Sequence, residues 1–147
     1  MNINVIFTTL SSGIPGQSSQ TESVLNYSTV RAALVADAKS ANDIIAAGSL
    51  SDSSIPLYIN GTRDNSNGSG SLTPYLDNNG ANKTSVRITT ANQKAPGLLA
   101  ANATGVDASI TFNSNFSFDF NPTDGITAGQ YDFVGIASHE IGHALGL

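Results

Sequence analysis

The sequence contains no cysteine and no tryptophan, and only 12% of its 147 residues are charged. Without cysteine, disulfide bonds and cysteine-ligated zinc sites are excluded. Lysine and arginine number six in total and the formal net charge is −5, so we expect no nucleic-acid partner. No apolar run reaches the ~18 residues that a membrane-spanning helix needs, so no membrane span is predicted.

Length and composition indicate one small globular domain. A hydrophobic content of 39% is ordinary for a chain that buries a core, and 147 residues suit a single domain over residues 1–147. Met1 leads directly into a strand-like pattern without a basic segment and a long apolar run, so no signal peptide is recognised. Serine, threonine, asparagine and glycine are abundant, a composition common among secreted proteins.

Hydrophobic periodicity predicts an α+β fold. Alternating or β-branched runs predict strands at residues 2–9, 55–60, 86–89, 108–112 and 116–120. Helical spacing predicts one long helix that ends at Gly48, with Ser19 or Ser28 as its N-cap. A second helix is expected to open with a capping box at residues 90–93, and Pro96 should kink or shorten it.

A long polar stretch, residues 61–85, separates two of the predicted strands. Calcium is one possible ligand there, because carboxylate and amide side chains are clustered, but neither cluster has the spacing or the terminal glutamate of a calcium-binding loop. A plain solvated loop is the other interpretation. The residues considered as calcium ligands are Asp64, Asn65, Asn67, Asp77, Asn78 and Asn79.

The only two histidines of the chain, His139 and His143, flank Glu140 in a His-Glu-x-x-His motif. Residues four apart lie on one face of a helix, so both imidazoles can reach a single ion. Zinc accepts imidazole nitrogens, and a catalytic zinc usually has three protein ligands and one water. The motif therefore predicts His139 and His143 as metal ligands and Glu140 as the general base.

Flanking residues predict the helix that carries this motif. The run from Thr127 to Gln130 fits a capping box, so we expect a helix from about Ala128 to about Leu145. Gly146 is suited to end it in the left-handed conformation. The histidines lie outside one apolar arc of this helix, which comprises Val134, Ala137, Ile141, Ala144 and Leu145.

The run HEIGHALGL, from His139 to Leu147, resembles the metzincin clan of zinc metalloendopeptidases, in particular secreted bacterial members. The resemblance implies an N-terminal lobe with a twisted mixed sheet, backed by helices, and an active-site helix beneath the cleft. It also implies a third metal ligand two positions past Leu147 and a downstream Met-turn, whereas the only methionine here is Met1. We therefore interpret residues 1–147 as an incomplete metalloprotease catalytic domain.

This resemblance implies a secreted, monomeric enzyme with one catalytic Zn²⁺ and a protein or peptide substrate. The clan binds extended substrate along an edge strand, for which residues 108–112 or 116–120 are the candidates. For the chain itself we predict weak zinc binding and little activity, since two histidines leave the ion half open to water.

Three alternatives to this reading stay open. One is a non-catalytic, zincin-like extracellular module with a structural or adhesive role, or an inactive fragment. Another is a gluzincin, which would take its third ligand from a glutamate on a later helix. In the last, an upstream carboxylate completes the site, the candidates being Asp119, Asp124 and Asp132.

Overall fold

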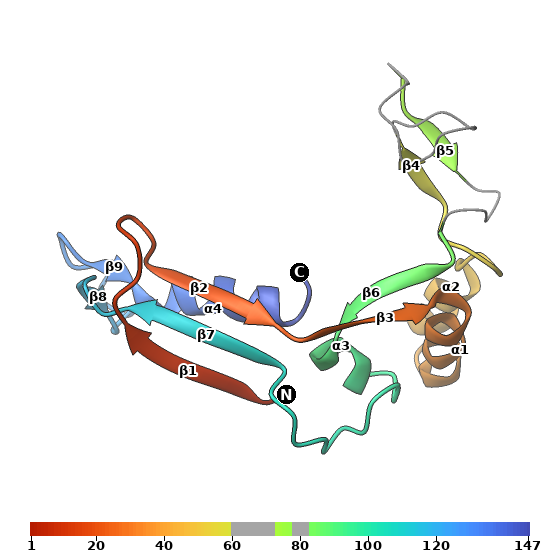
Figure 1. Ribbon diagram of the computed structural model, residues 1–147, viewed down its shortest axis with the longest axis horizontal. Coiled ribbons are helices and arrows are strands. Elements are labelled where there is room, and N and C mark those ends of the chain that lie inside the picture. The colour runs from red at the N-terminus through yellow and green to blue at the C-terminus, as the bar shows by residue number, and fades with distance from the viewer. Residues whose placement is uncertain (60–72, 78–82) are drawn as a thin grey trace. The chain divides into compact units, whose positions relative to one another are not determined.

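The structure is a computed structural model that describes residues 1–59, 73–77 and 83–147 (Figure 1). These residues form an α+β fold with mixed sheets and four helices. They divide into two compact units. The first comprises Met1–Ser23, Thr89–Ala95 and Leu99–Leu147, and the second comprises the described parts of Val24–Ile88 together with Pro96–Leu98.

The first unit is built on a three-stranded sheet in the order β1-β7-β2. The central strand, β7 (Ala108–Asn113), is parallel to β1 (Ile3–Thr8) and antiparallel to β2 (Gly16–Gln20). Helix α4 (Phe133–Ala144), which carries both histidines, runs beside β2 (Figure 1). The predicted strands at residues 2–9 and 108–112 are confirmed.

A cluster of phenylalanine rings holds the beginning of α4 against this sheet. The ring of Phe133 lies 4.7 Å from that of Phe112 and 4.6 Å from that of Phe120, measured between centroids. Phe118 belongs to β8 (Phe118–Asp119), which pairs in parallel with β9 (Tyr131–Asp132). Because such ring pairs add to the energy of apolar burial, the cluster stabilises the contact between the start of α4 and the sheet.

The second unit contains α1 (Tyr27–Asp37), α2 (Ala41–Gly48) and two short two-stranded sheets. Strand β3 (Glu22–Asn26) pairs with β6 (Ser85–Thr89), and β4 (Leu57–Ile59) pairs with β5 (Tyr75–Asp77). Tyr27 is buried, and its hydroxyl group donates a 2.8 Å hydrogen bond to the carbonyl oxygen of Ser51.

The single long helix predicted up to Gly48 is wrong, because the chain forms two helices there. Ser40 starts the second one: its hydroxyl oxygen accepts from the Asp43 N–H, and the Asp43 carboxylate accepts from the Ser40 N–H at 2.9 Å. This reciprocal capping box satisfies N–H groups that a continuous helix would have bonded internally. Neither predicted N-cap is correct. Ser19 lies on β2, and the N-cap residue of α1 is Asn26, so Ser28 lies inside the helix.

The expected start of the metal helix near Ala128 is also wrong. The Gln130 N–H donates to the Thr127 carbonyl oxygen at 3.0 Å, and Gly129 between them has a φ of +80°. A positive φ at the third residue is the signature of a type II turn, in which glycine is favoured. Residues 127–130 therefore form a turn, and α4 begins after β9, at Phe133.

Two further expectations need adjustment. The strand expected at residues 116–120 shortens to β8. Helix α3 (Thr90–Lys94) is capped by Thr89 instead of Thr90, and it ends before Pro96, as the shortening effect of proline predicts. In the part of the chain that the structure describes, no helix has the length and apolar character needed to cross a bilayer.

Candidate metal centre

The imidazole rings of His139 and His143 lie edge to face on the exposed side of α4. Their centroids lie 4.5 Å apart, and the two Nε2 atoms approach to 3.0 Å. This follows from the four-residue spacing, which places the two side chains one above the other on one face of the helix. The structure thus brings the two predicted metal ligands together.

The separation of the Nε2 atoms fits the binding of one zinc ion. Two nitrogens bound at about 2.0–2.1 Å in a tetrahedral site lie roughly 3.3 Å apart. Small rotations of the rings bring the observed 3.0 Å to that value. Without an ion, the same geometry suits a hydrogen bond from one ring nitrogen to the other, with the tautomer deciding which one donates.

Glu140 lies between the histidines in sequence and points toward β2. Its side chain is only 6% exposed, and it packs against the start of that strand at Gly16. A Cβ atom on Gly16 would lie 3.4 Å from Oε1 of Glu140 and 3.0 Å from Cγ2 of Ile136. The absence of a side chain at Gly16 therefore gives the carboxylate room beside the strand.

The apolar arc predicted for this helix is not the face that the sheet covers. Ala144 is buried, but Val134 is 44% exposed and Ile141 is 38% exposed. Phe133 and Glu140 instead lie on the side that meets the sheet. The glutamate occupies a position that an apolar residue would fill in an ordinary amphipathic helix, which sets it apart from a solvated surface charge.

An open cavity of about 420 Å³ lies between the histidine face of α4 and strand β2. His139, His143 and Glu140 all line it, so a ligand in the cavity lies beside all three residues. Its other lining residues belong to β2: Gly16, Gln17, Ser18 and Gln20. The sequence does not point to these residues, because Gly-Gln-Ser-Ser-Gln lacks the alternating apolar residues that mark a strand.

The helix ends as predicted at Gly146, whose φ is +79°. The Leu147 N–H donates to the Gly142 carbonyl oxygen at 3.0 Å, and the Gly146 N–H donates to that of His143 at 2.9 Å. This pair of bonds is a Schellman motif. Asn92 of α3 adds a hydrogen bond from its amide to the carbonyl oxygen of Leu145.

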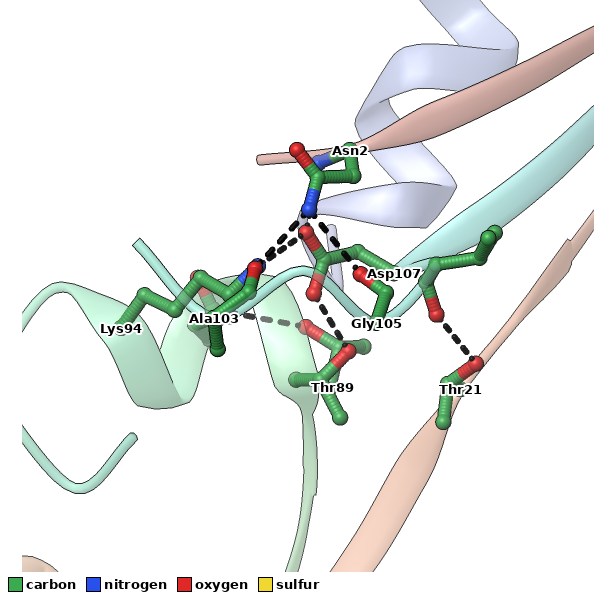
Figure 2. Close-up of polar contacts among 10 residues, drawn as sticks. Asn2, Thr21, Thr89, Lys94, Ala103, Gly105 and Asp107 are labelled. Atoms are coloured by element: carbon green, nitrogen blue, oxygen red, sulfur yellow. Dashed lines mark hydrogen bonds and ion pairs between the residues drawn. The ribbon is translucent and has the colours of Figure 1, made fainter. Parts of the chain in front are cut away.

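Helix α3 is itself anchored by a buried ion pair (Figure 2). Lys94 Nζ lies 2.7 Å from Oδ2 of Asp107, and the two side chains are 7% and 1% exposed. The Asn2 N–H also donates to Oδ2, and the Thr90 hydroxyl group donates to Oδ1. The network ties α3 to the beginnings of β1 and β7, so it indirectly positions the end of α4.

The same network sets the ionisation of Asp107. Burial of the carboxyl group is the largest influence and raises its pKa. Hydrogen bonds from Lys94, Asn2 and Thr90, together with the charge of Lys94, outweigh burial and lower the pKa to about 2. Asp107 therefore stays charged at neutral pH.

The three upstream carboxylates do not complete the metal site. Both oxygens of Asp119 accept backbone N–H groups, from Asn121 and Thr127, and the Thr127 bond is the main cause of its lowered pKa. Asp124 lies in an exposed turn, and Asp132 precedes α4. Within residues 1–59, 73–77 and 83–147, no three His, Asp or Glu side chains are arranged to hold one ion.

The calcium candidates fall largely outside the described residues. Those outside are Asp64, Asn65, Asn67, Asn78 and Asn79. Asp77 is described: it is 3% exposed, and its Oδ2 atom has no hydrogen-bond partner. The prediction of calcium stays untested.

No protein-family model, curated protein or solved structure matches this chain.

Proposed function

We propose that this protein is a zinc-dependent endopeptidase of the metzincin type. The observation that carries the proposal is the convergence of the His139 and His143 Nε2 atoms to 3.0 Å at a cavity that Glu140 also lines. Metal ligands and a base within one cavity are the groups that metal-assisted hydrolysis requires. A purely structural zinc site has no use for a carboxylate between its ligands.

His139 and His143 would hold the zinc ion as neutral imidazoles. The bound ion supplies a Lewis acid that polarises a peptide carbonyl and lowers the pKa of a water toward ~7. A third protein ligand is not among the described residues. The metzincin resemblance takes it from the second position after Leu147, in a longer form of the protein.

Glu140 serves as the general base. Its carboxylate accepts a proton from the attacking water and then donates that proton to the departing amine. Its exposure of only 6% limits the positions open to the side chain, so the carboxylate is restrained before substrate binds. The same burial keeps water from part of the group, which strengthens its interaction with a reacting proton.

The open edge of β2 supports an extended peptide as the substrate. The Asn113 N–H bonds to the Pro15 carbonyl oxygen, and the Thr21 N–H bonds to that of Asp107. Because backbone groups alternate along an antiparallel pair, the N–H and C=O groups of Gly16, Ser18 and Gln20 point away from β7. A substrate strand can pair with these groups beside the histidines.

Strand β2 replaces the substrate-binding strands expected from the sequence. Residues 108–112 belong to β7, which has a partner on both sides, and residues 116–120 form only the short β8. The mixed sheet with α4 beside its antiparallel edge strand supports a metzincin-like lobe. The low charge of the chain and the resemblance to secreted enzymes support a role outside the cell.

Replacement of Glu140 tests the proposal. In the full-length protein, Glu140→Gln is expected to keep zinc binding and to reduce casein hydrolysis by at least 100-fold, in line with the ~10²–10⁴-fold effects of general bases. Zinc content and cleavage are measured on the same preparation. Hydrolysis at the parental rate would contradict the role of Glu140. Zinc binding without hydrolysis in the parental protein would favour the non-catalytic extracellular module.

A further inference from the structure

A second cavity adjoins the first on the other side of Glu140. It has a volume of about 320 Å³ and shares Gly16, His139 and Glu140 with the first cavity. Its remaining lining residues are Pro15, Gly135 and Ile136, none of which carries a polar side chain. The first cavity is instead completed by Gln17, Ser18, Gln20 and His143.

The two cavities follow each other along both β2 and α4. The apolar cavity is lined by the residues that come earlier in each element, and the polar one by those that come later. Glu140 and His139 border both cavities, so the reacting bond lies where they meet. The lining thus differs in chemistry on the two sides of the base.

We infer that the two cavities are subsites for neighbouring side chains of an extended peptide, one apolar and one polar and uncharged. This inference rests on the proposed function for the position of the scissile bond. Alternate side chains of a strand point the same way and lie about 6.6 Å apart. The cavities therefore take side chains two residues apart, with the residue between them facing outward.

The direction of β2 sets the order of the two side chains. Antiparallel strand pairing is the more stable arrangement. A peptide antiparallel to β2 passes the polar cavity, near Gln20, before the apolar cavity, near Pro15. The preferred sequence is then polar, any residue, apolar, such as Gln-Ala-Leu.

One side chain of the lining sets what the apolar subsite accepts. Ile136 supplies the largest apolar side chain in the lining. A branched aliphatic residue of the size of leucine matches such a wall, and burying it excludes water from apolar surface on both partners.

The test is a titration of the ¹⁵N-labelled chain, carrying Glu140→Gln to prevent cleavage, with capped hexapeptides followed by NMR. The central residues are Gln-Ala-Leu, Leu-Ala-Gln, Gln-Ala-Gln or Leu-Ala-Leu. Gln-Ala-Leu is expected to bind about tenfold more tightly than Gln-Ala-Gln, because its leucine is buried. The Gly135 and Ile136 amide signals are expected to move only with peptides that place leucine in the apolar subsite.

Two variants serve as matched controls. Ile136→Ala should weaken the preference for leucine, and Gln20→Ala should leave that preference intact while reducing the preference for glutamine at the other position. Equal affinity for all four peptides, no binding at all, or unchanged Gly135 and Ile136 signals would overturn the inference.

Each titration is repeated with a chelator, because the lining residues do not need the metal. The same preference without zinc supports the subsites independently of hydrolysis. If that preference is present but the full-length protein used in the casein assay above hydrolyses no casein, then the proposed function alone has failed.

Discussion

The side-chain amide of Asn92 donates a hydrogen bond to the carbonyl oxygen of Leu145, the residue that caps the C-terminus of α4. This bond joins two segments that are 53 positions apart in sequence. It satisfies a carbonyl group that the helix leaves without an internal partner. Helix α3 therefore braces the end of α4 that carries His143.

Replacement of Asn92 with alanine should loosen this brace. We expect Asn92→Ala to lower the free energy of unfolding by about 1 kcal/mol, the usual value of one hydrogen bond. Hydrogen–deuterium exchange should accelerate at the amides of Leu145 and Gly146. Asn42→Ala, on the exposed surface of α2, is the matched control and should leave exchange at these amides unchanged. Equal exchange in both variants would show that α3 does not brace the helix.

Replacement of Gly146 should destabilise the Schellman turn. The φ of +79° costs a residue with a side chain about 1–2 kcal/mol, and a Cβ atom would lie 3.0 Å from Nδ2 of Asn92. Gly146→Ala is therefore expected to lower the melting temperature. Gly48→Ala is the control with the opposite sign: it lies at the end of α2 with open space around it, so it should not lower the melting temperature. Equal melting temperatures for both variants would contradict the assignment.

Two ion pairs of similar length allow a matched comparison of burial. Asp107 lies 2.7 Å from Lys94 with both side chains buried, whereas Asp52 lies 2.8 Å from Arg31 and is 95% exposed. Asp107→Asn should lower the free energy of unfolding by about 3–5 kcal/mol, because Lys94 keeps a buried charge without its partner. Asp52→Asn should cost at most about 1 kcal/mol. Urea denaturation measures both, and similar losses would contradict the role of burial.

Asp107 also predicts how stability depends on pH. Its pKa is about 2 in the folded protein and ~3.9 in an unfolded chain. A lowered carboxyl pKa stabilises the fold above the unfolded value, and this contribution is lost as the pH falls from about 4 to about 2. The free energy of unfolding should fall over that window in the parental protein and fall less in Asp107→Asn. Equal slopes in the two proteins would rule out Asp107 as the source.

The elements predicted correctly from the sequence are those whose signals are local. Ile3, Val5 and Phe7 alternate within β1, and Gly146 follows a strongly periodic helix. The caps predicted at Ser19 and at Thr127 rest on local patterns as well, but other interactions outweigh them. Gln20 pairs with Ala108 across 88 positions, and Gly129 turns the chain before a helix can start. The long-range pairing of Gln20 cannot be recognised in a short window of sequence.

Of the candidate site, the sequence predicted only the part whose signal is local. The four-residue spacing of His139 and His143 is enough to place these two side chains on one helix face, but it does not reveal that Glu140 faces the sheet. Strand β2 has the sequence Gly-Gln-Ser-Ser-Gln, which lacks the alternating apolar residues that mark a strand. Its role becomes visible only when its hydrogen bonds with β7 place it beside α4.

The most direct test of the central claim is a zinc titration of the 147-residue chain by isothermal calorimetry at neutral pH. We predict weak binding of one ion per chain, lost in His139→Ala and in His143→Ala. Binding should be retained in Ser138→Ala, whose hydroxyl group bonds only to the Val134 carbonyl oxygen of the same helix. Binding that survives both histidine substitutions, or no binding by the parental chain, would contradict the assignment of His139 and His143 as the metal ligands.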